Sequence, residues 1–170
     1  GAYTTSSMQA DISARQYPNM TILFSAGNSG IDSNSDGEVD LDSLGAPASA
    51  KNVLTVGASE NDRPTITSTW GTTKYSPPVS TDRLADNISG LAAFSSRGPT
   101  DDNRLKPDIV APGTFILSAL TRYNTQSVGW MAYNASYVYM GGTSMSTPLT
   151  AGATALLLEH LIYNLGHQDP

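Results

Sequence analysis

Residues 141–148 read GGTSMSTP, a glycine pair followed by a serine-rich entry into an apolar segment. Residues 137–140 before them are typical of a strand, and a helix is predicted over residues 146–164, with Pro148 in its first turn and Gly166 just past its end. Apolar residues occupy nearly the whole circumference of this helix, which is typical of an interior helix. A sharp turn between a strand and a helix holds a serine hydroxyl at a fixed point. The helix dipole and the free N–H groups there favour negative charge.

The same pattern also has a plain structural interpretation. Ser146 and Thr147 are good helix-capping residues, and the two glycines turn the chain. On this segment alone, capping and catalysis remain alternatives.

The first sixty residues follow a helix–strand–loop order. A helix is predicted over residues 5–17, where Met8 and Ile12 share a face. Residues 21–25 and 53–58 are short, continuous apolar runs, typical of strands buried on both faces. This order predicts an α/β fold.

The middle of the chain has weaker patterns. Residues 60–91 are rich in Pro, Thr, Ser, Asp and Asn and are predicted as surface loops, with short antiparallel strands as an option. Residues 106–113 hold an apolar segment between prolines, which predicts an edge strand or a stiff extended passage.

Composition excludes several classes of partner. Nine basic and fifteen acidic side chains give a net charge of −6, so phosphate backbones and anionic lipid surfaces are repelled. No nucleic-acid partner is therefore expected. No apolar stretch approaches the ~20 residues that cross a bilayer, so no membrane partner is expected either. With no cysteine, the chain has neither disulfides nor thiolate chemistry.

Residues 141–148 resemble the nucleophile motif of the subtilases, the subtilisin-like serine peptidases, in which the serine after Gly-Thr attacks the peptide bond. The resemblance assigns this role to Ser144 and not to Ser146. Residues 24–30, FSAGNSG, resemble the oxyanion turn of the same family. It implies that the side-chain amide of Asn28 and the N–H of Ser144 donate to the developing oxyanion.

Two further segments resemble framework signatures of the subtilases, and they lie between the oxyanion turn and the nucleophile as in that family. They are residues 94–99, FSSRGP, and residues 106–113, KPDIVAPG. Four matches in the correct order make a chance resemblance improbable, and the bacterial oxidant-stable alkaline branch is the most similar. The resemblance implies an α/β fold with a doubly wound, mostly parallel sheet, peptide-bond hydrolysis and secretion.

One departure from the family pattern is informative. Subtilases place an aspartate in an Asp-Ser/Thr-Gly turn and a histidine in a His-Gly-Thr motif before the oxyanion asparagine, and neither motif is present. His160 lies ~24 Å along the predicted helix from Ser144, beyond hydrogen-bond reach, and His167 follows that helix. The chain also begins with Gly1 rather than Met. We therefore expect residues 1–170 to be the C-terminal half of a catalytic domain, inactive without an upstream half that supplies the base.

The resemblance also implies a polypeptide substrate and a pocket for it. The resemblance implies that Ser25, Ala26 and Gly27 and the segment Gly45-Ala46-Pro47 form walls of the main specificity pocket, and that an upstream strand outside these residues forms the opposite wall. Such a slot would accept an apolar or aromatic side chain.

An acidic loop is a candidate calcium site. Residues 32–40 match a calcium loop through its first nine positions, but the twelfth position is Ser43 rather than a bidentate glutamate. A solvated acidic turn is the alternative. The candidate ligands are Asp32, Asn34, Asp36, Glu38 and Asp40.

Two functions without catalysis remain open. The chain could be a calcium-binding module on the same scaffold, or one half of a split domain that acts by docking its partner. The predicted strands and helix leave apolar faces without neighbours, so self-association is also expected.

Overall fold

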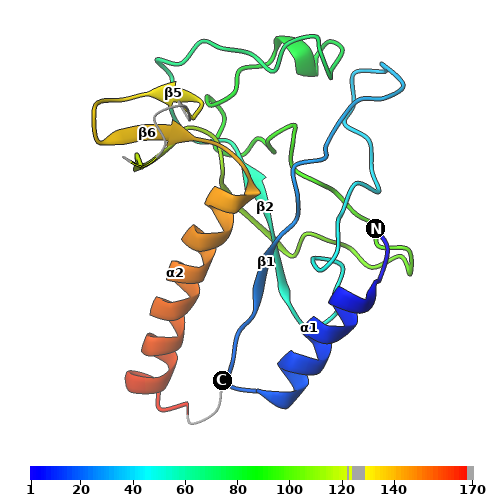
Figure 1. Cartoon of the computed structure of the whole chain (residues 1–170), viewed down its shortest axis with the longest axis vertical. Helices are drawn as coiled ribbons and strands as arrows, with labels where there is room; N and C mark the ends of the chain where they lie inside the picture. Colours follow the sequence, from blue (N-terminus) through cyan, green and yellow to red (C-terminus); the bar gives the residue numbers. More distant parts are fainter. Residues whose placement is uncertain (122, 124–128, 168–170) are drawn as a thin grey trace.

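A parallel sheet of three strands forms the centre of the chain (Figure 1). The strands are β1 (Leu23–Ser25), β2 (Leu54–Ser59) and β3 (Ile109–Pro112), in the order β1-β2-β3. In register, Ser25 lies opposite Val56, and Val56 lies opposite Ile109. This is a computed structural model, which describes residues 1–121, 123 and 129–167. The α/β class with a parallel sheet is confirmed, and β3 is an edge strand as predicted.

Two helices cover opposite faces of this sheet (Figure 1). Helix α1 (Thr5–Gln16) packs through Ala10 on Val53 and Phe24. Helix α2 (Thr143–Tyr163) crosses the other face and contacts all three strands. Side chains alternate between faces along a strand, so neighbouring residues of β1 and β2 pack against different helices.

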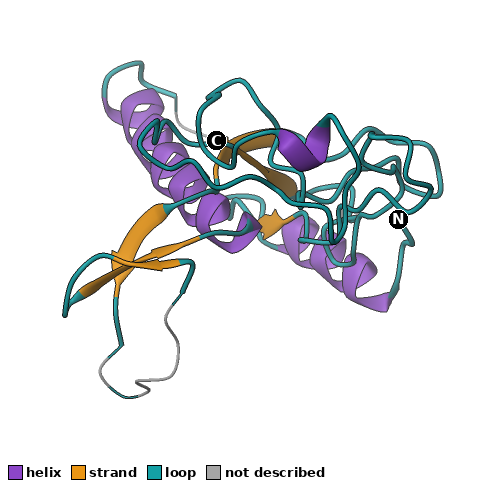
Figure 2. Cartoon of the chain, turned by 90° about the horizontal axis from the view of Figure 1, so that it is seen from above, coloured by secondary structure: helices purple, strands orange, loops and turns teal. Residues whose placement is uncertain are grey.

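A second, antiparallel sheet leads into α2. It consists of β4 (Ile116–Ala119), β5 (Met131–Ala132) and β6 (Tyr137–Met140), in the order β4-β6-β5. Figure 2 shows this small sheet standing off to one side of the body. Strand β6 has the predicted bounds and runs directly into the turn before α2. The predicted loops at residues 60–91 contain only the short 3₁₀ helix η1 (Val79–Thr81) and isolated bridges.

The face of α1 that carries Met8 and Ile12 is not its buried face. Met8 and Ile12 are 45% and 54% exposed, whereas Ser7 and Ala10 are buried. The Ser7 hydroxyl shares a hydrogen bond of 2.9 Å with the Ser49 hydroxyl. Small side chains on this face let the helix approach the neighbouring turn closely, so the long apolar side chains point elsewhere.

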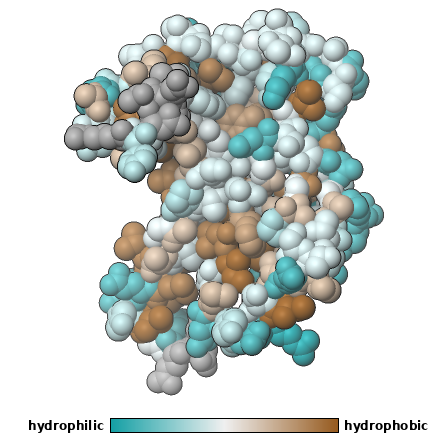
Figure 3. All heavy atoms as spheres, in the orientation of Figure 1, coloured by the Kyte–Doolittle hydropathy of each residue, from teal (hydrophilic) through white to brown (hydrophobic). Residues whose placement is uncertain are grey.

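Helix α2 is predicted to be interior in a complete domain, but within the described residues one side of it has no neighbour. Only Thr143, Ser146 and Thr150 of this helix are buried, and Leu156 is 69% exposed. One face of the helix contacts the sheet, and no described element covers the other. Figure 3 shows apolar side chains gathered on this uncovered side, over α2 and β1.

Among the helices that the structure describes, none combines the length and the apolar character that a membrane span requires.

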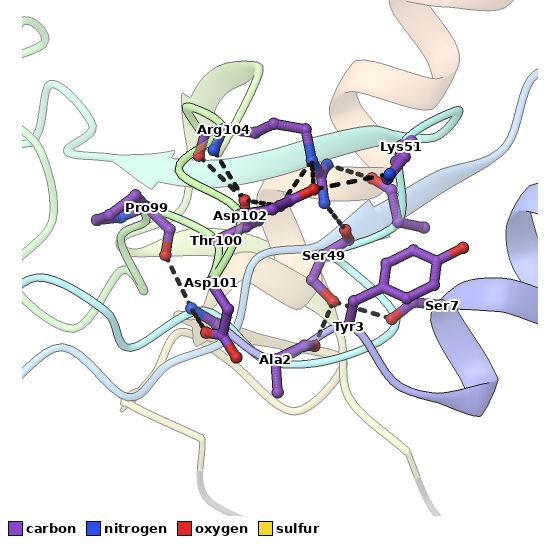
Figure 4. Close-up of polar contacts among 12 residues, drawn as sticks. Ala2, Tyr3, Ser7, Ser49, Lys51, Pro99, Thr100, Asp101, Asp102 and Arg104 are labelled. Carbon is purple, nitrogen blue, oxygen red and sulfur yellow. Dashed lines mark hydrogen bonds and ion pairs between the residues drawn. The ribbon is translucent and has the colours of Figure 1, made fainter.

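A polar network ties α1 to the loop after residue 99 (Figure 4). The Arg104 guanidinium donates to Asp102 at 3.0 Å and to the Ser49 carbonyl at 2.7 Å. The Ser49 hydroxyl donates to the carbonyl of Ala2 at 2.7 Å. The hydrogen bond from Arg104, with a smaller contribution from Thr100, holds the pKa of Asp102 well below its usual range. This network fixes the N-terminal segment beside the sheet.

Candidate active site

The turn after β1 meets the turn before α2 at the carboxyl-terminal end of the parallel sheet. The Asn28 Oδ1 atom accepts hydrogen bonds from the Thr143 N–H at 2.9 Å and from the Thr143 hydroxyl at 3.0 Å. Both contacts use the oxygen of the amide, and none of the described residues accepts from its nitrogen. Asn28 is exposed, so this nitrogen is positioned to donate to a bound group.

Glycine at position 142 makes this approach possible. Gly142 has a φ of 143°, which residues other than glycine rarely adopt. A Cβ at this position would lie 3.3 Å from Asn28 Nδ2. The Gly142 N–H donates to the Gly113 carbonyl at 2.8 Å. Gly113 itself lies so close to Ala58 that a Cβ would be 2.5 Å from the alanine Cβ. The end of the KPDIVAPG segment therefore anchors the turn that carries Ser144.

Ser144 and Ser146 have different surroundings. Ser144 is exposed in the first turn of α2, where its N–H has no intrahelical acceptor. Among the described residues, nothing bonds to its hydroxyl. Ser146 is fully buried, and its hydroxyl donates to the Thr143 carbonyl at 3.0 Å. Of the two, only Ser144 can reach a substrate, and the positive end of the helix dipole lies beside it.

The FSSRGP segment holds the Asn28 turn in place. The Ser96 hydroxyl accepts from the Ser29 N–H at 3.0 Å, and the Ser96 N–H donates to the Gly27 carbonyl at 2.9 Å. Gly27 has a φ of 110°, and a Cβ there would lie 2.8 Å from the Ser96 Oγ. Ser95 accepts from the Ala58 N–H of β2 at 3.0 Å. The segment thus links the turn to the sheet.

The KPD residues join β3 to β2. Lys106 is buried, and its ammonium donates to the Val53 carbonyl at 2.9 Å and to Asp108 at 2.6 Å. Asp108 also accepts from the Thr55 N–H at 2.7 Å. A buried ammonium needs such partners, and together they fix the strand that ends at Gly113.

The structure brings the two predicted walls of the specificity pocket together. The Gly45 N–H lies 3.5 Å from the Ala26 carbonyl, and Ala26 packs with Leu44 and Ala48. Ser25 and Gly27 are half-buried, and Gly45 is exposed. The two segments lie side by side next to the Asn28 turn.

Main-chain N–H groups of the acidic loop and of Ser76 organise the loop around Asp32. Asp32 is buried, and its carboxylate accepts from the N–H groups of Asp36, Gly37 and Ser76 at 3.0, 3.1 and 2.9 Å. Burial by itself would raise the pKa of Asp32, but these N–H donors together hold that pKa below its ordinary value.

Three of the other candidate ligands, Asn34, Asp36 and Asp40, likewise accept or donate side-chain hydrogen bonds within the loop. Asp36 accepts from the Glu38 N–H at 2.9 Å and from the Asn34 amide at 2.7 Å, and Asp40 accepts from the Ser33 N–H at 2.8 Å. Within the described residues, no three Asp, Glu or His side chains converge as a metal-binding group. The five residues do not form a cage in this conformation, and calcium binding stays a prediction.

Both histidines of the chain are exposed and lie away from Ser144. His160 sits in the last turns of α2, ~24 Å along the helix, where its ring contacts the Asn164 amide at 2.8 Å. His167 follows the helix. Neither histidine can act as a base for Ser144.

Sequence reasoning missed two supporting residues of this site, Thr143 as the anchor of Asn28 and Ser96 as the support of its turn. Both contacts join loops that lie far apart in the chain. A pattern of apolar residues carries no signal for such contacts.

Comparison with known proteins gives a family match over residues 2–168, to the subtilase family. Serine protease AprX of Bacillus subtilis is 34% identical over 142 residues, which cover 82% of this chain and 26% of AprX. The serine protease/ABC transporter B family protein tagB of Dictyostelium discoideum is 29% identical over 213 residues, 95% of this chain and 11% of tagB.

A likeness to solved structures supports the fold. The self-cleaved protease domain of PatA superposes with a TM-score of 0.57 at 22% identity, covering all of this chain and 44% of that one. The chain spans about a quarter of AprX and about a tenth of tagB. With a family match over nearly its whole length, this chain belongs to the subtilase family.

Proposed function

We propose that this chain supplies the nucleophile and the oxyanion donors of a subtilisin-type serine endopeptidase that acts on polypeptides. The observation that carries the proposal is the pairing of Asn28 with Thr143, the residue directly before the exposed Ser144. The family match and the serine protease relatives support the same reaction.

In this reaction the Ser144 Oγ attacks the carbonyl carbon of the scissile bond and gives its proton to a base. The carbonyl oxygen becomes an oxyanion, which accepts hydrogen bonds from Asn28 Nδ2 and the Ser144 N–H. Collapse of the tetrahedral species breaks the C–N bond, and the protonated base returns its proton to the leaving amine. Water then hydrolyses the acyl-enzyme by the same route.

The base comes from residues outside these 170. Neither His160 nor His167 reaches Ser144, and a serine hydroxyl is a poor nucleophile without a positioned base. Loss of the histidine alone from a subtilisin triad costs on the order of 10⁶ in kcat. The 170 residues alone are therefore inactive in this proposal.

A further part of the same catalytic domain is the proposed partner of the bare faces. Leu149, Leu156 and Leu157 of α2 are exposed, and strands β1 and β3 are only partly covered. Exposed apolar area costs ~25 cal/mol per Å², so a covering segment would stabilise the domain, and self-association is the outcome when it is missing. Structural calcium on the acidic loop and secretion belong to the same proposal.

The test uses the protein expressed from its complete coding sequence. A fluorophosphonate probe, which reacts with activated serines, should label it, and peptide substrates should be cleaved. Ser144→Ala should abolish labelling and cleavage, while the control Ser146→Ala should keep labelling. Undiminished labelling of the Ser144→Ala protein would contradict the assignment.

A further inference from the structure

Trp130 packs its indole ring directly on the main chain of Gly141, three residues before Ser144. A Cβ built on Gly141 would lie 2.1 Å from Cζ2 of the ring and 2.3 Å from Cε2. Gly141 is not among the glycines with positive φ, so its backbone conformation suits any residue. The tryptophan ring, and not the turn, therefore explains why position 141 holds glycine.

The ring is held rigidly from several sides. Gly129 before it has a φ of 60°, and any Cβ there would overlap atoms of β6. The Trp130 N–H donates to the Tyr139 carbonyl at 2.8 Å. The ring makes edge-to-face contacts with Phe94 and Phe115, at centroid distances of 5.9 and 5.1 Å. Such contacts fix the orientation of an aromatic side chain.

A large part of this fixed side chain is nevertheless open to solvent. Trp130 is 38% exposed. An indole that is already immobilised loses little conformational entropy when an apolar group packs on it, so it is a favourable contact for a ligand. Because the ring touches the segment that carries Ser144, an apolar group on it would lie close to the reacting bond.

The contacts also decide which side of the scissile bond the ring faces. The proposed pocket for the acyl side chain is lined by the segments of Ala26 and Gly45, next to the end of β1. Trp130 instead packs on Gly141, Phe94 and Phe115, and none of these residues belongs to that pocket. A peptide bond placed at Ser144 between the two would direct the residue that leaves toward Trp130.

The geometry points to Trp130 as a specificity-determining residue whose ring forms the wall of a subsite for an apolar side chain on the first residue after the scissile bond. This inference rests on the proposed peptidase function. It names a preference for apolar over small or charged residues at that position.

The experiment measures kcat/KM for internally quenched peptides that differ only in the residue after the scissile bond, with Phe, Leu, Gly or Asp there. The full-length protein should favour Phe and Leu. Trp130→Ala should lose about tenfold or more with these two and less than about threefold with Gly, the range expected for apolar contacts. Trp130→Phe should recover most of the loss. The control is Tyr133→Ala, which removes an exposed ring of the same hairpin that packs on Tyr139.

The rate of fluorophosphonate labelling separates this role from a structural one, because the probe needs Ser144 but has no residue after the scissile bond. Equal losses with all four peptides, together with slower labelling, would show that Trp130 only supports the Gly141 turn. An unchanged preference in Trp130→Ala would overturn the inference while leaving the proposed function standing. A full-length protein that cleaves none of the peptides and resists the probe would contradict the proposed function, and this inference with it.

Discussion

Asn28 accepts two hydrogen bonds from Thr143 through a single oxygen, at 2.9 Å from the N–H and 3.0 Å from the hydroxyl. The two residues are 115 positions apart, so this contact joins the end of β1 to the start of α2. It fixes which way the Asn28 amide faces, because an oxygen engaged by two donors leaves the nitrogen on the open side.

The contact predicts a positioning role for the Thr143 hydroxyl. Thr143→Val keeps the shape and the main-chain bond but removes one of the two donors. A net hydrogen bond of ~0.5–1.5 kcal/mol corresponds to a loss of roughly 2- to 10-fold in kcat, with KM nearly unchanged. Thr143→Ser should retain activity in the same steady-state assay. A rise in KM with constant kcat would indicate that Thr143 supports substrate binding instead.

Asn28 itself should have a larger effect. Asn28→Ala in the full-length protein should lower kcat by roughly 10²–10³ with little change in KM, because the donor acts on the oxyanion and not on the substrate carbonyl. This range is the one known for the oxyanion asparagine of a subtilisin and is not calculated from the present distances. Steady-state kinetics on a peptide substrate decide the matter, and a loss below about threefold would remove Asn28 from the oxyanion site.

The acidic loop can be tested by melting. Calcium that binds only the native state stabilises by mass action, about 2.7 kcal/mol when its concentration is a hundred times Kd, and raises the Tm. Millimolar calcium should therefore raise the Tm of the parent protein, and Asp36→Ala should abolish the increase. The exposed Asp62, outside the loop, provides the control variant Asp62→Ala. Identical melting curves with calcium and with chelator would exclude a structural calcium site.

Glu60 predicts a specific pH dependence of stability. Its side chain is 1% exposed, and burial raises its pKa above the ordinary value of 4.5 despite a hydrogen bond from the Asn87 N–H at 3.2 Å. The folded state therefore binds this proton more tightly than the unfolded state. The contribution of Glu60 to stability is greatest below pH 4.5 and falls as the pH rises through the folded pKa.

In the Glu60→Gln variant the side chain at this position does not titrate. The free energy of unfolding of the variant should therefore lack the fall with rising pH that Glu60 causes. The measurement is urea unfolding of both proteins at a series of pH values, with the difference in free energy of unfolding plotted against pH. Asp11 and Asp32 have lowered pKa values, so their contributions to the free energy of unfolding decrease as the pH falls. Both residues are present in both proteins, so these contributions cancel in the difference. A difference that stays constant with pH would show that Glu60 does not titrate in this range.

The sequence allowed the main elements of the parallel sheet to be predicted, and it failed where small side chains or missing neighbours decide the packing. Strand β6 and the edge strand β3 follow from β-prone residues and prolines. Strands β4 and β5 were not predicted, because β5 has only two residues and β4 is recognisable only through its pairing with β6. The buried face of α1 could not be predicted from apolar spacing, since Ser7 and Ala10, rather than Met8, are its buried residues.

The candidate site shows the same division. Ser144 and Asn28 were assigned through resemblance to the subtilases, and the structure places their two turns against each other. Their supports Thr143 and Ser96, and the neighbour Trp130, depend on contacts between distant loops. Periodicity and spacing describe neighbours along the chain, so they contain no information about such contacts.

The packing of the Trp130 ring on Gly141 also limits which substitutions this subtilase can accept at these two positions during evolution. Any side chain at position 141 collides with the ring, while loss of the ring alone leaves a gap beside the glycine. Substitutions at the two positions are therefore epistatic: a smaller residue at 130 has to be fixed before anything larger than hydrogen is accepted at 141. Evolutionary changes at position 141, beside the nucleophile turn, and at position 130, the proposed subsite wall for the leaving peptide, should therefore occur together.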